Sequence, residues 1–116
     1  MTAVRIYHNP RCGKSRSACA LIAERDVDAE VVEYLKHPLG RDELRALLDK
    51  LGLKPQDLIR RGEAVFKEHF AGKALDDEEW IDAMVAYPIL MERPIVVRGE
   101  RAVVARPPER VAELFD

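Results

Sequence analysis

The chain has 116 residues, of which 47% are hydrophobic, and its 21 acidic and 19 basic side chains give a formal net charge of -2. This length and composition predict one domain, spanning residues 1–116, with its own hydrophobic core. The small net charge, without a long run of one sign, argues against a nucleic-acid partner. The first residues carry charge at Arg5 and His8 and no long apolar stretch, so we expect no signal peptide, no membrane span and a cytoplasmic location.

The N-terminal part of the chain is predicted to form a β-α-β unit. Residues 4–7 have strand composition, and residues 15–25 carry apolar side chains at helical spacing. Residues 30–34 are typical of a second strand and are followed by turn-forming residues at 37–40. Such a unit joins two parallel strands by a right-handed crossover.

The middle of the chain, approximately residues 41–86, is predicted to be a mainly helical insertion. Its clearest helix covers residues 42–51, where four leucines form one stripe, acidic residues fill the first turn and a glycine follows the last turn. From residue 54 to residue 86 the pattern stays helical in short pieces, and Asp76 or Asp77 is the expected N-cap of the last piece.

Two strands and a helix are expected at the C-terminal end. Residues 94–98 and 101–105 have strand composition, and Gly99-Glu100 between them is typical of a tight hairpin turn. Pro107-Pro108 then opens a last helix, because proline is tolerated in the first helical turn. The order β-α-β, helical insertion, β-β-α predicts an α/β protein with a thioredoxin-like fold.

Cys12 lies where the first predicted strand ends and the first predicted helix begins. A cysteine at a helix N-terminus faces unpaired backbone N–H groups and the positive end of the helix dipole, and both favour the thiolate. Arg11, Lys14 and Arg16 add positive charge nearby. The same N–H groups can bind an anion, so the sequence predicts a reactive sulfur and an oxyanion at one electropositive place.

The second cysteine, Cys19, is interpreted as a packing residue, because apolar residues surround it in the same predicted helix. Its spacing from Cys12 is poor for a structural disulfide and wrong for a closed zinc site. We therefore expect two reduced thiols and no metal ion. His37 and His69 are expected at the surface.

Four separated segments resemble, in their sequence and their order, the ArsC family of glutaredoxin-coupled arsenate reductases. They are residues 6–16, 58–60, 88–97 and 106–107. The resemblance covers nearly the whole chain. It implies a thioredoxin-like fold with a helical insertion, an enzyme that reduces arsenate to arsenite, no bound cofactor, glutathione as co-substrate and glutaredoxin as partner.

The resemblance also implies roles for individual residues. Cys12 is the expected nucleophile toward arsenate, and Arg60, Arg93 and Arg106 are the expected ligands of the oxyanion. Planar guanidinium groups suit an anion with several acceptor oxygens better than flexible ammonium groups do.

Three further residues are expected to support this chemistry. By the same resemblance, His8 helps to lower the pKa of the cysteine, and Pro94 is a cis-proline facing it. Ser15 lies one helical turn after Cys12, and its hydroxyl group is a candidate hydrogen-bond donor to the sulfur.

Two other functions remain open from the residues. An Spx-like redox-responsive regulator has a related fold and binds RNA polymerase, and a Cys-x-x-Cys switch would favour it, but Ser15 stands three residues after Cys12. A monothiol glutaredoxin-like exchanger acting on glutathione mixed disulfides would need Cys12 alone, and three arginines would be superfluous.

The chain departs from the family pattern at two places. It stops at Asp116, soon after its last predicted helix, whereas better-studied members continue with a C-terminal extension. Tyr87 stands where relatives often carry histidine. We expect the second change to alter packing near the site without removing a ligand.

Overall fold

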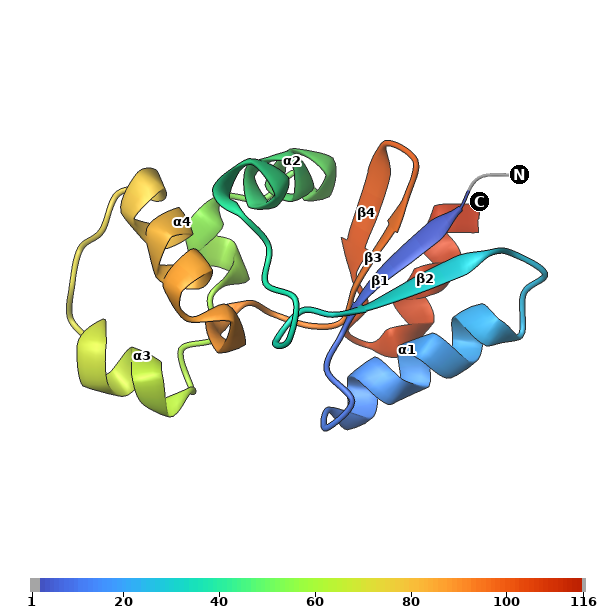
Figure 1. The fold of residues 1–116 in the computed structure, drawn as a ribbon, viewed down its shortest axis with the longest axis horizontal. Helices are drawn as coiled ribbons and strands as arrows, with labels where there is room; N and C mark the ends of the chain where they lie inside the picture. The colour runs from blue at the N-terminus through green and yellow to red at the C-terminus, as the bar shows by residue number, and fades with distance from the viewer. Residues whose placement is uncertain (1–2, 116) are drawn as a thin grey trace. The chain divides into compact units, whose positions relative to one another are not determined.

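The computed structural model describes residues 3–115, which form two compact units (Figure 1). The first unit combines the residues up to His37 with those from Arg93 onward, and the second unit consists of Pro38–Glu92. The second unit contains the expected helical insertion and extends beyond it at both ends. The single domain expected for residues 1–116 stays a prediction.

The first unit contains a four-stranded sheet with the order β2-β1-β3-β4. The first strand pairs parallel with the second and antiparallel with the third, and the last two strands pair antiparallel. In chain order the strands are β1 (Val4–His8), β2 (Ala29–Glu33), β3 (Ile95–Arg98) and β4 (Arg101–Val104). The arrangement confirms the α/β thioredoxin-like fold, with its parallel crossover and its antiparallel hairpin.

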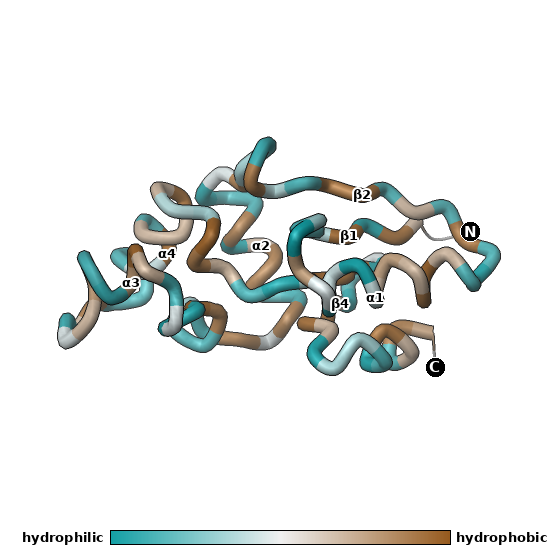
Figure 2. Tube along the Cα trace, turned by 90° about the horizontal axis from the view of Figure 1, so that it is seen from below, coloured by the Kyte–Doolittle hydropathy of each residue, from teal (hydrophilic) through white to brown (hydrophobic). Residues whose placement is uncertain are grey.

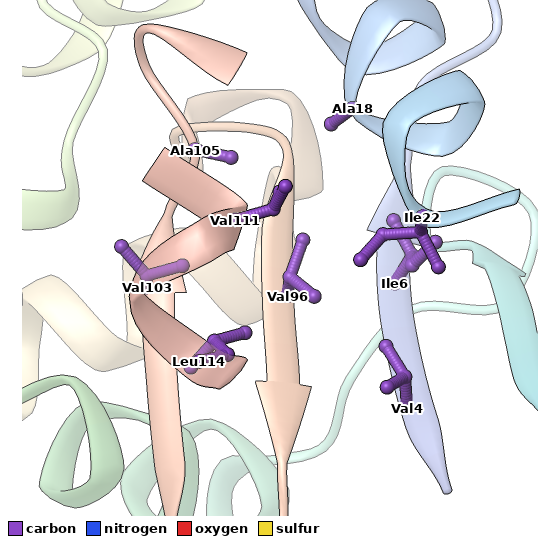
Figure 3. Close-up of a cluster of buried hydrophobic side chains, with 9 residues drawn as sticks. All are labelled: Val4, Ile6, Ala18, Ile22, Val96, Val103, Ala105, Val111 and Leu114. Atoms are coloured by element: carbon purple, nitrogen blue, oxygen red, sulfur yellow. The ribbon is translucent and has the colours of Figure 1, made fainter. Parts of the chain in front are cut away.

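One core cluster packs the helices of this unit against the sheet. Figure 3 shows Ala18 and Ile22 of helix α1 (Gly13–Ala23) beside the apolar side chains of β1. The 3-10 helix η3 (Pro108–Phe115) contributes Val111 and Leu114 to the same cluster. Nine buried residues form the cluster: Val4, Ile6, Ala18, Ile22, Val96, Val103, Ala105, Val111 and Leu114. Burial of this apolar surface is the main force that holds the first unit together.

Two boundaries differ from the sequence expectation. Helix α1 begins at Gly13 instead of Ser15, because the carbonyl of Cys12 already accepts the N–H of Arg16 at 3.0 Å. The last helix begins at Pro108, and Pro107 lies before it after a cis peptide bond. Cys12 is thus the N-cap of α1, as its sequence position predicts.

The two edge strands of the sheet are β2 and β4. Figure 2 colours the middle of β2 brown, the hydrophobic end of its scale. β2 is an edge strand, and its Val31 is 51% exposed. At the other edge, the β3–β4 hairpin turns through Gly99, whose φ of 62° lies in the region that glycine enters without steric cost.

The second unit is built from short helices. They are α2 (Arg41–Leu51), η1 (Pro55–Leu58), α3 (Ala64–His69), α4 (Asp77–Ala86) and η2 (Pro88–Leu90), of which η1 and η2 are 3-10 helices. Three of the four leucines in the stripe of α2 are buried, the fourth, Leu51, is partly buried, and an apolar face of α4 is buried. The buried residues are Leu44, Leu47, Leu48, Trp80, Ile81, Ala83 and Met84. Helical periodicity alone predicted the stripe of α2 correctly.

Helix α4 has the cap that the sequence predicts. Asp76 accepts the backbone N–H of Glu79 at 2.8 Å, and the Glu79 carboxylate accepts the backbone N–H of Asp76 at 3.1 Å. This reciprocal pair satisfies two N–H groups that the first helical turn leaves unpaired. The cap therefore fixes where α4 begins.

Within residues 3–115, no helix is both long and apolar enough to cross a membrane.

Candidate functional site

The candidate site is built around Cys12, between the end of β1 and the start of α1. Its backbone is extended, with φ -95° and ψ 121°, which is the conformation expected of an N-cap residue. Its side chain is partly buried, and both cysteines of the chain are free thiols. The first turn of α1 therefore presents its unpaired backbone N–H groups beside a partly accessible sulfur.

Several groups act on the ionisation of Cys12. Partial burial is the largest single influence and opposes the thiolate, but the backbone N–H groups of Ser15 and Lys14 and the side chain of Arg93 favour it. Together they hold the pKa of the Cys12 thiol below its ordinary value. This is the direction expected for a cysteine that acts as a nucleophile near neutral pH.

Arg93 and Arg106 come from the other end of the chain and meet Cys12 in the same unit. The side chain of Arg93 lowers the pKa of the Cys12 thiol, as a hydrogen-bond donor to the thiolate and through its positive charge. Nη1 of Arg106 lies 4.0 Å from Sγ of Cys12 and donates to the carbonyl of Arg93 at 3.0 Å. The fold thus brings together three residues from distant parts of the sequence, and the roles of the two arginines as oxyanion ligands stay predictions.

Pro94 fixes the backbone beside these arginines. The Arg93-Pro94 peptide bond is cis, as expected, and the carbonyl of Pro94 accepts the N–H of Ala105 at 2.9 Å. This bond ties the residue after Arg93 to the residue before Arg106. The two arginines are consequently held side by side, one just before the start of β3 and the other just beyond the end of β4.

His8 contacts Ser15 and Cys19. Its Nδ1 lies 2.6 Å from Oγ of Ser15 and 3.5 Å from Sγ of Cys19. Burial lowers the pKa of His8, and Arg16 acts in the same direction against the opposing charge of Glu33. A lowered pKa favours the neutral ring at neutral pH. The role expected of His8 toward the Cys12 thiol stays a prediction.

Ser15 is fully buried and uses its hydroxyl group within the loop. Besides its contact with His8, Oγ of Ser15 accepts the backbone N–H of Asn9 at 3.0 Å. Toward Cys12, the group of Ser15 that lowers the thiol pKa is its backbone N–H. A hydroxyl bond from Ser15 to the sulfur remains a prediction.

Arg60 belongs to the second unit and is held by two carboxylates. Its Nε donates to Glu63 and its Nη1 to Glu92, each at 3.0 Å. The arginine side chain is 22% exposed, and the backbone around it is fixed by a β-bridge between Ile59 and Met91. The structure therefore orients this guanidinium, and its role as an oxyanion ligand stays a prediction.

Cys19 differs from Cys12 in its surroundings. It is partly buried and packs against the core cluster of the first unit. Burial raises the pKa of its thiol. Its packing agrees with the sequence interpretation, but the sequence did not predict its contact with His8.

The sequence interpretation also missed Asn9. This residue is 4% exposed, accepts the backbone N–H groups of Arg11 and Cys12, and donates its own N–H to Oγ of Ser15. The dipeptide Asn9-Pro10 is itself a turn signal, so the sequence contained a sign of its position.

Among residues 3–115 no cluster of three or more histidine, cysteine or acidic side chains is arranged to hold a metal ion.

Known proteins resemble this chain over almost its whole length. The model of the ArsC family matches residues 7–114. An arsenate reductase of Neisseria meningitidis serogroup A is 40% identical over 113 residues, which cover 96% of this chain and 97% of that protein. The uncharacterized protein YfgD of Escherichia coli K12 is 48% identical over 113 residues, with 96% and 95% covered. The solved structure of an arsenate reductase from Vibrio cholerae has a TM-score of 0.93 at 39% identity, with 97% and 98% covered.

Proposed function

The chain belongs to the ArsC family, and from this membership we propose that it is a cytoplasmic arsenate reductase with Cys12 as its nucleophile. The observation that carries the proposal is the meeting of one activated thiol with Arg93 and Arg106 at the N-terminus of α1. The names of its relatives support arsenate as the substrate.

The charges of the site suit an oxyanion. Arsenate at neutral pH carries one or two negative charges and several acceptor oxygens, and guanidinium groups pair with such anions through parallel N–H bonds. Arg93 and Arg106 supply two such groups beside the sulfur. Arg60 is proposed as the third, with Glu63 and Glu92 holding its orientation.

The proposed reaction starts with attack of the Cys12 thiolate on arsenic. A sulfur–arsenic bond forms, and one arsenate oxygen leaves as water after taking up protons. The thiol of glutathione then displaces a second oxygen as water. The thiol of glutaredoxin attacks the glutathione sulfur, so the bond between that sulfur and arsenic breaks, its electron pair stays on arsenic, and a disulfide of glutaredoxin and glutathione forms. Water finally hydrolyses the bond between Cys12 and arsenic, which releases arsenite and restores the Cys12 thiol. In the balanced sum, arsenate and two thiols give arsenite, one disulfide and water, so arsenic gains the two electrons that the thiols lose.

A coupled assay tests the reductase and its electron donor together. Arsenate-dependent oxidation of NADPH is followed with glutathione, glutathione reductase and glutaredoxin present, and the Cys12→Ser protein serves as the blank. The proposal predicts a rate that requires both glutaredoxin and Cys12. Release of glutathione from mixed disulfides, without any arsenate-dependent rate above the blank, would instead identify a thiol exchanger.

A binding measurement tests two of the three arginines. Titration calorimetry with arsenate is expected to show clear loss of affinity in Arg60→Ala and in Arg93→Ala. Arg61→Ala is the matched control, because this neighbouring arginine is exposed and lies over the ring of Phe66, 5.4 Å from its centre. Equal affinity in Arg60→Ala and Arg61→Ala would remove Arg60 from the proposed site.

A further inference from the structure

The loop that delivers Cys12 to α1 is a turn closed by a single residue, Asn9. Its carbonyl accepts the N–H of Cys12 at 3.0 Å, and its side-chain Oδ1 accepts the N–H of Arg11 at 3.0 Å. Pro10, at the second position of the turn, has its φ fixed by its ring. An Asn side chain that bonds the backbone two residues further on is a known way of closing such turns.

The same residue also ties the turn to the helix that follows. The backbone N–H of Asn9 donates to Oγ of Ser15 at 3.0 Å. Asn9 is 4% exposed and Ser15 is fully buried, so water does not easily replace these bonds. We call these three hydrogen bonds of Asn9, to Arg11, Cys12 and Ser15, the Asn9 clasp.

The clasp fixes the part of the backbone on which the chemistry of the thiol depends. The sulfur gains its stabilisation from backbone N–H groups in the first turn of α1 and from Arg93, and Arg106 lies nearby. These interactions weaken steeply when distances and angles change. A turn held at both ends keeps the sulfur within their reach.

We propose that Asn9 is a positioning residue for Cys12, holding the thiol at the N-terminus of α1 against Arg93 and Arg106. The proposal rests on the function proposed above for Cys12. Asn9 does not touch the reacting atoms in this scheme; it acts through the backbone of the nucleophile.

Because Asn9 is uncharged, its effect on Cys12 through backbone geometry can be distinguished from a direct electrostatic effect. The charged side chains that the structure places at the sulfur are Arg93 and Arg106 from the C-terminal part of the unit. Lys14 and Arg16 follow Cys12 in the first turn of α1, and the Arg16 guanidinium donates to the carbonyl of Pro10 at 2.9 Å. Asn9 is neutral, so replacing it removes no charge from the site. A change in the ionisation of Cys12 on its replacement must therefore come from altered geometry.

The test is the pH dependence of Cys12 alkylation by iodoacetamide in buffer free of phosphate and arsenate. Trypsin cleaves after Arg11, Lys14 and Arg16 and so separates the fragments that carry Cys12 and Cys19. Mass spectrometry then reports each thiol separately. The proteins are wild type, Asn9→Ala, Asn9→Ser and the control Ser17→Ala, which alters an exposed position of the same helix.

Asn9→Ala is expected to move the Cys12 profile to higher pH and to reduce its alkylation rate at pH 7 by about threefold to tenfold, the effect of one lost hydrogen bond. Asn9→Ser should lie between it and wild type, because a hydroxyl closes such turns more weakly. Ser17→Ala should match wild type.

A wild-type Cys12 profile in folded Asn9→Ala would overturn the proposal. If circular dichroism shows that Asn9→Ala is unfolded, the Asn9→Ser variant tests the proposal instead. An alkylation profile of Cys12 in Asn9→Ser identical to that of wild type would then overturn the proposal. The assay contains no arsenate, so it can fail while the reductase assay succeeds, and the reverse also holds.

Discussion

Cys12 and Cys19 lie at the start and in the middle of the same helix, and the structure gives them opposite chemical characters. At Cys12 the backbone N–H groups of Ser15 and Lys14, with Arg93, outweigh burial and lower the thiol pKa. At Cys19 burial acts without such compensation and raises it. One residue type thus has its thiol pKa lowered or raised according to whether it meets the N-terminal end of a helix dipole and a cation.

The largest expected effect is the difference in arsenate turnover between substitution of Cys12 and substitution of Cys19. Cys12→Ser should reduce arsenate turnover on the order of 10³-fold or more, because a serine hydroxyl is not ionised near neutral pH. Cys19→Ser makes the same chemical change in the same helix and should keep most of the rate. Steady-state rates in the coupled assay measure both, and comparable losses in the two variants would contradict the single-thiol scheme.

The second prediction concerns a substitution that removes Arg93, the cation that distinguishes Cys12 from Cys19. Arg93→Ala should raise the pH at which Cys12 is alkylated and lower arsenate turnover on the order of 10²-fold, since it loses both a thiolate partner and a proposed anion ligand. The Cys19 profile should not move. Arg110→Ala is the control, because Arg110 is exposed and paired with Glu113 at 2.9 Å. A Cys12 profile that is the same in both arginine variants would exclude Arg93 as its stabilising group.

The smallest expected effect is on stability. The pKa of Cys12 is lowered in the folded protein, so its contribution is present above the ordinary thiol pKa and is lost as pH falls through the lowered value. The pKa of Cys19 is raised, so its contribution is present below the ordinary value and is lost as pH rises through the raised one. In urea unfolding, Cys12→Ser should therefore lose more stability relative to wild type at about pH 9.5 than at about pH 6, on either side of the ordinary thiol pKa.

Cys19→Ser should show the reverse dependence in the same experiment. The comparison uses differences from wild type at each pH, so titrations that the proteins share cancel. A pH-independent difference for both variants would show that neither thiol changes its pKa on folding.

Local signals in the sequence predicted much of the fold. Periodicity predicted the leucine stripe of α2, Gly99 with Glu100 predicted the hairpin turn, and the pair Asp76 and Asp77 predicted the start of α4, where Asp76 is the cap. These features depend on neighbouring residues, so the sequence contains them directly. The helical insertion was recognised from its pattern, but its compact unit extends to Pro38 and Glu92, because packing and not helical periodicity sets its limits.

Short-range sequence patterns predicted less of the candidate site than of the fold. The position of Cys12 as an N-cap followed from the strand–turn–helix pattern, but its meeting with Arg93 and Arg106 required the resemblance to a family. The pairing of Arg60 with Glu92 spans more than thirty positions of the chain, and no short-range pattern predicts it. Asn9 was overlooked because its hydrogen bonds involve backbone groups and a buried hydroxyl that become visible only in the folded loop.

The most direct test of the central claim is the alkylation of both thiols in one sample of the wild-type protein across the pH range. The account predicts that the rate for Cys12 rises through a midpoint below the ordinary thiol pKa and that the midpoint for Cys19 lies above it. A Cys12 midpoint at or above that of Cys19 would contradict the claim that the helix N-terminus and Arg93 make Cys12 the reactive thiol.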